Sequence, residues 1–72
     1  WDVLVVVEDR PGIIAGIAVP LAERGINIKD IEVLKVREGE GGTLRLAFAT
    51  QEQAREAIEI LTGKGHAARL RE

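Results

Sequence analysis

The stretch VLVVVEDRPGIIAGIAVPLAERGINIKDIEVLKVR, residues 3–37, decides the fold because it encodes a strand, a helix and a second strand in succession. Residues 3–7 are valine or leucine and are apolar at both alternating positions, which predicts a strand buried on both faces. A loop follows at residues 8–12, where Pro11 fixes its own φ and keeps Arg10 out of the helical region. The chain is therefore predicted to turn sharply after its first strand.

Residues 12–24 follow a helical pattern, because apolar side chains recur at every third or fourth position. Gly25 suits the position just after a helix, where the backbone adopts a positive φ. Pro20 removes one backbone hydrogen bond inside this helix. We expect a kink there rather than an end, since the apolar stripe continues through Leu21.

Residues 26–37 are predicted to form one long strand. The apolar side chains change sides along this run, because Ile28 stands at an even position and Ile31 at an odd one. An extra residue in a strand reverses its alternation, so a β-bulge near Lys29 and Asp30 would explain one change of side.

A glycine-rich hairpin turn at residues 38–42 leads into a predicted strand at residues 43–49. Leu44, Leu46 and Phe48 share one face of this strand, which is the pattern of a strand with one buried side. The strand is therefore expected to pack that face on the core.

Thr50 and Gln53 have the spacing of a capping box, with Thr50 before the first turn of a second helix. Gly63 ends this helix, and residues 66–71 form a short last strand. The order strand, helix, strand, strand, helix, strand predicts an α+β fold of the ferredoxin-like type, a four-stranded antiparallel sheet with two helices on one face.

The composition limits the chain to one small domain, residues 1–72, with no disulfide and no thiolate metal site, since it has no cysteine and a single histidine. The chain opens on Trp1 and has no methionine, so we expect it to be excised from a longer enzyme. A small core and an apolar outer sheet face both favour self-association.

Charge and hydropathy exclude several partners. The net charge is −2 and the pI about 5.4, which does not fit a nucleic-acid-binding surface. The longest apolar run, residues 3–7, is too short to cross a membrane. The lack of cysteine fits a cytoplasmic location.

Catalytic and cofactor-binding patterns are missing from the sequence. It has no serine and no cysteine, and His66 has no second ligand or acid/base partner near it in sequence. Glu38 and Glu40 lie in the hairpin turn, where acid/base groups would be poorly positioned. We therefore expect no catalytic residue, no metal and no cofactor in this chain.

The loop before the first helix is the best candidate for a binding site. Gly12 leaves backbone room at a helix N-terminus, where free N–H groups attract a carboxylate. Asn27 begins the second predicted strand, at the other end of that helix, so both could contact one ligand only from different subunits. Ordinary turn chemistry at Asp9, Pro11 and Asn27 explains the same residues without a ligand.

The motifs Asp9-Arg10-Pro11-Gly12 and Gly25-Ile26-Asn27-Ile28, with this order of elements, resemble the ACT domain, a regulatory module of amino-acid metabolism. The resemblance covers essentially the whole chain. It implies a ferredoxin-like fold, a homodimer or higher pairing of ACT domains, and an amino acid bound at the interface between domains. The ligand contacts it implies are Asp9, Arg10, Pro11, Gly12, Ile13, Asn27 and Ile28.

Two details refine this resemblance. Serine-sensing members have histidine where Val7 stands and asparagine where Asp9 stands, which argues against serine as the ligand. The stretch KVREGEGGTLRLAF, residues 35–48, is similar to the C-terminal domain of many bacterial prephenate dehydrogenases. That similarity implies an NAD-dependent host enzyme inhibited by tyrosine. A pairing domain without a ligand, and an ACT domain of another enzyme of amino-acid metabolism, stay open as alternatives.

Other proteins with this topology fit the residues less well. An RNA-recognition module needs exposed aromatic residues on its strands, and this chain offers only Phe48, at a core position. A metal-carrier domain needs two cysteines in the first loop, and acylphosphatase needs a glycine-rich arginine loop that the sequence lacks.

Overall fold

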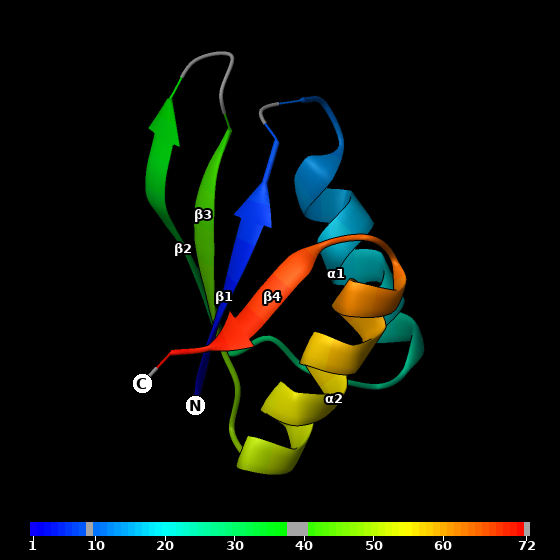
Figure 1. Ribbon diagram of the computed structural model, residues 1–72. Helices are drawn as coiled ribbons and strands as arrows, with labels where there is room; N and C mark the ends of the chain where they lie inside the picture. Colours follow the sequence, from blue (N-terminus) through cyan, green and yellow to red (C-terminus); the bar gives the residue numbers. More distant parts are fainter. Residues whose placement is uncertain (9, 38–40, 72) are drawn as a thin grey trace.

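Two helices pack on one face of a four-stranded antiparallel sheet in the computed structural model, which describes residues 1–8, 10–37 and 41–71 (Figure 1). The elements are β1 (Asp2–Val7), α1 (Ile13–Glu23), β2 (Asp30–Arg37), β3 (Gly41–Ala47), α2 (Gln51–Gly63) and β4 (Ala67–Leu70). The strands lie in the order β2-β3-β1-β4, and all neighbours run antiparallel. The predicted ferredoxin-like fold is confirmed.

The core lies between the sheet and the two helices. Leucine, isoleucine and phenylalanine side chains from both layers are buried there together with small alanines of α2, so the layers approach closely. The buried apolar side chains are those of Val3, Val5, Val7, Ile17, Leu21, Ile26, Leu44, Leu46, Phe48, Ala54, Ala57 and Leu61.

β1 buries only one of its two apolar faces within the chain. Val3, Val5 and Val7 face the helices and are buried, whereas Val6 on the opposite face is 58% exposed and Leu4 is half-buried. The prediction of a strand buried on both faces is therefore wrong for a single chain. Both helices lie on the same side of the sheet, and no described element covers the other side (Figure 1).

α1 continues through Pro20 to Glu23, and the backbone after it closes the helix. Gly25, with φ +74°, donates its N–H to Ala22 O at 2.9 Å, and the Ile26 N–H donates to Leu21 O at 2.9 Å. These two bonds make a Schellman motif. They hold Ile26 in the helix cap, which is why the strand begins at Asp30 and not at residue 26 as predicted.

The bulge in β2 lies later than predicted. β2 pairs with β3 without interruption from Asp30 to Val33, and the register shifts between Val33 and Lys35. The change of side near Lys29 needs no bulge, because the residues before Asp30 belong to the helix cap and its connection.

β3 begins at Gly41 and ends at Ala47, two residues earlier at each end than predicted. Gly41 adopts φ +86°, and a Cβ there would lie 2.2 Å from Val7 O, so this position at the start of β3 requires glycine. Without a side chain, the start of β3 comes close to the end of β1.

Thr50 caps α2, since its Oγ1 accepts the Gln53 N–H at 3.1 Å. The reciprocal bond of a capping box is missing, because Gln53 Oε1 is buried without a partner in the described structure. α2 ends at Gly63 as predicted, and Gly65 takes the positive φ of +91°. Neither described helix has the length and hydropathy to cross a membrane.

Candidate functional site

The β1–α1 loop brings most of the predicted ligand contacts to one end of the sheet. Gly12 caps α1 with φ +79°, and the loop closes through Arg10 N–H to Glu8 O at 3.1 Å and Ile13 N–H to Arg10 O at 3.4 Å. Arg10, Pro11 and Gly12 are exposed, and Ile13 is half-buried against the core. The prediction for Asp9 lies outside the described residues.

Asn27 and Ile28 lie at the opposite end of the domain from that loop, beyond the C-terminus of α1 (Figure 1). Asn27 is exposed, and Ile28 is half-buried against the core. One chain therefore does not bring the two predicted segments to a common site.

A small apolar cavity opens beside the loop, with a volume of about 150 Å³. Its walls come from the end of β1, the first turn of α1, and the paired strands β2 and β3. They are formed by Val7, Glu8, Ile13, Ile14, Val33, Gly41, Gly42 and Leu44. Glu8 is the one charged side chain among these described residues, so the cavity suits an apolar group.

Sequence reasoning missed the residues that β2 and β3 contribute to this cavity. Val33, Gly41 and Leu44 reach it only because β3 pairs with both β1 and β2. The tandem glycines at residues 41 and 42 are the signal that could have found it, since glycine in a strand marks a close backbone approach.

An exposed apolar strip borders the cavity along α1 and the outer edge of the sheet. It consists of Ile14, Ile31 and Val33, which are 45%, 40% and 53% exposed. Ile31 and Val33 pair with the core residues Leu46 and Leu44 and so face the helix layer, yet the helices do not cover them. We call these three residues the α1–β2 strip.

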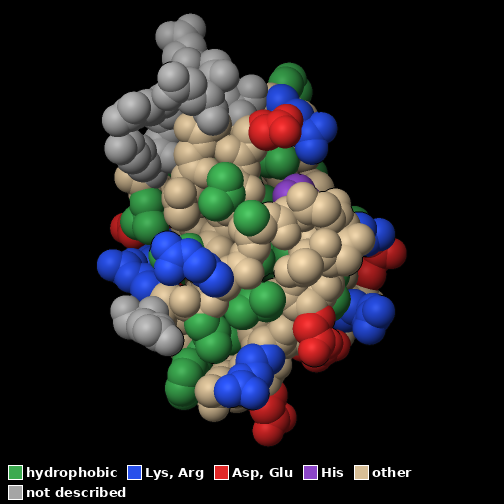
Figure 2. Space-filling model, viewed as in Figure 1, with side chains coloured by type: hydrophobic (Ala, Val, Ile, Leu, Met, Phe, Trp, Pro, Cys, Tyr) green, Lys and Arg blue, Asp and Glu red, His purple; other side chains and the backbone are tan. Residues whose placement is uncertain are grey.

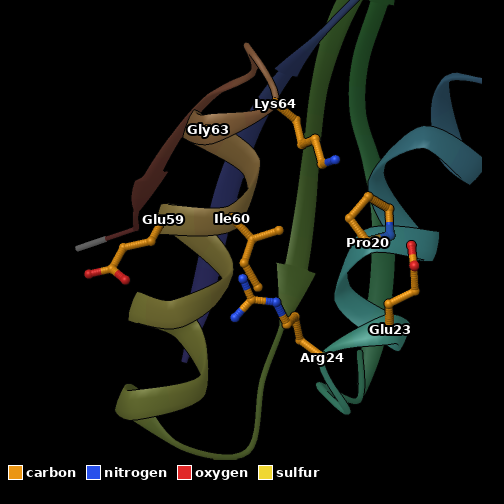
Figure 3. A pocket seen from close by; sticks show the side chains of 7 residues that line it. All are labelled: Pro20, Glu23, Arg24, Glu59, Ile60, Gly63 and Lys64. Atoms are coloured by element: carbon orange, nitrogen blue, oxygen red, sulfur yellow. The ribbon is translucent and has the colours of Figure 1, made fainter.

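A larger groove, of about 350 Å³, separates the outer sides of α1 and α2 (Figure 3). Arg24 and Lys64 point into it, Glu59 points away, and Pro20 and Ile60 form its sides. None of the described residues predicted as ligand contacts lines this groove, and its mixed charges indicate a solvated surface rather than a site for one ligand.

Arg45 forms an ion-pair network on the sheet face that the helices leave open. It donates to Asp30 at 2.7 Å, to Glu32 at 3.2 Å and to Asp2 at 3.4 Å, and its own side chain is only 15% exposed. The hydrogen bond from Arg45, and then that from the Ile31 N–H, lower the pKa of Asp30 below its ordinary value of 3.8. The same bond to Asp30 is the main reason that the pKa of Arg45 is raised.

This network links β1, β2 and β3, so its role is structural. Among the residues that the structure describes, no three histidine, cysteine, aspartate or glutamate side chains gather into a metal-binding group. The apolar cavity beside the β1–α1 loop is therefore the best candidate for a functional site.

Comparison with known proteins identifies the family to which this chain belongs. The profile of the ACT domain matches residues 1–63. A prephenate dehydrogenase of Bacillus subtilis (strain 168) is 31% identical over 64 residues, which are 89% of this chain and 17% of that enzyme. The chain thus spans about a sixth of the length of this relative.

Two solved structures share the fold. The crystal structure of the ACT domain of a prephenate dehydrogenase from Bacillus anthracis superposes with a TM-score of 0.86 at 30% identity, over 96% of this chain and 100% of that one. The ligand-free regulatory subunit of aspartate kinase from Thermus thermophilus superposes with a TM-score of 0.79 at 29% identity, over 99% of this chain and 49% of that one.

Proposed function

The chain belongs to the ACT domain family, and on that basis we propose that it senses an amino acid, tyrosine first, between two paired copies and so regulates a prephenate dehydrogenase. Domains of this family are regulatory, generally bind amino acids and pair up in regulatory assemblies. The catalytic part of such an enzyme lies elsewhere.

The apolar cavity beside the β1–α1 loop carries this proposal. Cavities that enclose a whole small ligand have volumes of about 300–1,000 Å³. The cavity in one chain has about 150 Å³, so it would take the side chain of an amino acid and leave the rest for a second copy to cover. Val7 in its wall makes it suited to an apolar or aromatic side chain rather than to that of serine.

The charged groups of the ligand would lie at the mouth of the cavity. The N-terminus of α1 begins at Gly12 and has no acidic residue in its first turn, so it would attract the carboxylate. An exposed amide such as Asn27, from a second copy, would then accept a hydrogen bond from the ammonium group.

The α1–β2 strip is the surface that we propose for pairing. β2 lies at the edge of the sheet, with one side free to add a strand. Twofold symmetry would set the two β2 strands antiparallel, because each contact in such an interface is repeated with the copies exchanged. This arrangement brings Asn27 of one copy toward the β1–α1 loop of the other.

The host enzyme in this proposal is an NAD-dependent prephenate dehydrogenase, with both NAD and the catalytic residues outside this chain. The similarity to ACT domains of two Bacillus prephenate dehydrogenases supports this choice of host. Feedback by tyrosine would then act from this domain on the distant catalytic part.

A thermal-denaturation screen with each of the twenty amino acids tests the proposal. A ligand at about 100 times its Kd adds about 2.7 kcal/mol to the stability of the folded state. For a domain of this size, each kcal/mol raises Tm by about 4–8 °C. We expect tyrosine or another aromatic amino acid to raise Tm, and serine to have no effect.

Variants at Gly12 show whether the effect comes from this site. Asparagine and aspartate both tolerate a positive φ, and a Cβ at Gly12 meets no atom within 4 Å. Gly12→Asp would place a carboxylate where the ligand carboxylate binds and abolish the Tm shift, whereas Gly12→Asn is the uncharged control and should keep part of it. Equal Tm shifts in Gly12→Asp and Gly12→Asn would refute this site. If no amino acid raised the Tm of the unsubstituted chain, the chain would be a pairing domain without a ligand.

A further inference from the structure

The two helices end in the same backbone motif but differ at one position. α2 repeats the cap of α1, because Gly65 N–H donates to Thr62 O at 3.0 Å and His66 N–H donates to Leu61 O at 2.9 Å. The residue after the glycine is the buried Ile26 in the first motif and the partly exposed His66 in the second. An apolar side chain commonly packs on the helix at this position. Helix termination therefore does not explain a histidine there.

His66 lines a cavity of about 310 Å³ on the other side of β1 from the apolar one. The walls come from the end of β1, the β1–α1 loop and the connection from α2 to β4, and they include Arg10, Lys64 and His66. Figure 2 shows the histidine recessed in the surface, with basic and acidic side chains gathered beside it. Lys64 lines this cavity and also the groove between α1 and α2, into which Figure 3 shows its side chain pointing.

Basic side chains outnumber acidic ones among the described residues that line this cavity, although the chain as a whole is acidic. Glu8 is the single acidic side chain among the described residues of its walls, and it pairs with Arg10 at 3.6 Å. Lys64 adds a second positive charge, and the imidazole of His66 adds ring nitrogens that can form hydrogen bonds.

We propose that this cavity binds a small oxyanion with two negative charges, either phosphate or a dicarboxylate. Arg10 offers planar paired N–H donors for such a group, Lys64 a point charge, and His66 an imidazole ring N–H donor. Arg10 from the β1–α1 loop, and Lys64 and His66 from the α2–β4 connection, thus line one cavity that is large enough for a small anion.

The anion cavity adjoins the proposed amino-acid site and shares part of its wall, but the basic side chains of the anion cavity do not line the apolar one. Val7, Glu8 and Ile13 line both cavities, so an anion in one lies directly behind the wall of the other. Lys64 and His66 line the anion cavity but not the apolar cavity. If the chain did not bind an anion at this cavity, the proposal of an amino-acid site would therefore be unaffected.

His66 is the only histidine, so its imidazole carbon–proton signals in an NMR spectrum report on this cavity without ambiguity. We would titrate the 72-residue chain at pH 6.5 with sodium phosphate or with malonate, holding ionic strength constant with NaCl. The imidazole signals should shift along a saturable curve, with a Kd on the order of 1 mM. A response to one anion alone identifies it as the ligand class, and a response to both assigns the site to doubly charged oxyanions in general. A shift that rises linearly, or that NaCl alone reproduces, overturns the proposal.

A matched pair of lysine variants tests whether the anion binds specifically at this cavity. Lys64→Gln should weaken phosphate or malonate binding about three- to fivefold, the upper range for one exposed charge pair. Lys29→Gln removes the same charge just before β2, outside the cavity, and should leave the affinity unchanged. Equal weakening in the two variants would mean that the anion responds to overall charge and would refute the site.

The variant His66→Ile distinguishes an effect on anion binding from an effect on the stability of the fold. It restores the apolar residue that the matching cap of α1 has, so Tm without the anion should stay the same or rise. The anion-dependent rise in Tm that we expect for the unsubstituted chain should disappear. Retention of that rise in His66→Ile would contradict the role assigned to the histidine.

Discussion

The two edges of the sheet differ in how far the chain completes them. At the β2 edge, Ile31 and Val33 face the helix layer but stay exposed. At the β4 edge, α2 packs on a strand of four residues, and Ala68 and Leu70 are half-buried beneath it. The helices cover one edge of the inner face and leave the other uncovered. The uncovered edge is where the proposed second copy would add.

Edge strands are protected from unwanted pairing when they are short or carry charged side chains. β4 meets both conditions, with four residues and an exposed Arg69. β2 has eight residues and two exposed apolar side chains beside the apolar cavity. Its bulge after Val33 limits regular pairing to the first half of the strand, which would help to fix the register of a partner.

The largest expected effect is at Gly41, which joins the β2 side of the sheet to β1. Gly41→Ala would place a Cβ 2.2 Å from Val7 O at a positive φ, so β3 must move away from β1. We expect the free energy of unfolding to fall by about 2 kcal/mol or more, the range for substitutions that force backbone strain. Urea denaturation followed by circular dichroism measures this loss.

Gly63→Ala is the control for that substitution. A Cβ at Gly63 meets no atom within 4 Å and its φ is not positive, so the unfolding free energy should change by less than about 0.5 kcal/mol. Similar losses in both variants would mean that the close approach at Gly41 does not limit stability.

A charged residue on β2, at the uncovered edge of the sheet, should weaken the pairing of two copies. Val33→Lys places an ammonium group in the proposed interface, and we expect the dimer dissociation constant to rise at least tenfold, about 1.4 kcal/mol. Sedimentation equilibrium measures this constant directly.

Two lysine variants of exposed residues elsewhere locate the interface. Ala67→Lys, at the covered edge, and Val6→Lys, on the open sheet face, should leave the dissociation constant unchanged. A loss of pairing in Val6→Lys with none in Val33→Lys would place the interface on the open sheet face. A monomer at all concentrations would remove the pairing proposal altogether.

The smallest expected effect is the pH dependence contributed by the Arg45 network, which holds the open edge to the rest of the sheet. The folded-state pKa of Asp30 is below its ordinary value of 3.8, so the unfolded chain binds its proton first as pH falls. The contribution of Asp30 is complete above pH 3.8 and is lost as the pH falls through the lower folded value.

Asp30→Asn should therefore lose part of the acid dependence of Tm below about pH 4. Arg45→Gln should lose it as well, because it removes the main cause of the lowered pKa of Asp30. The change is small, since exposed ion pairs contribute little to stability. Identical pH profiles in all three proteins would show that this pairing does not persist in solution.

Local patterns predicted the elements because each depends on neighbours in sequence. The spacing from Thr50 to Gln53 predicted the start of α2, and Gly25 predicted the end of α1. The boundaries of β2 were harder, because the cap that holds Ile26 uses the same apolar residue that a strand would use. The bulge after Val33 depends on pairing with β3, which sequence spacing does not reveal.

The sequence by itself determined the order of the elements, the helix caps, the ferredoxin-like class and the loop around Gly12, since periodicity and turn chemistry act over a few residues. Only the tertiary structure decided which apolar residues stay exposed and which segments share a cavity. Val33, Gly41 and Val7 meet through strand pairing across the sheet, and Lys64 and His66 come beside Arg10 because β4 pairs with β1. Such contacts join residues far apart in the chain, and no local pattern encodes them.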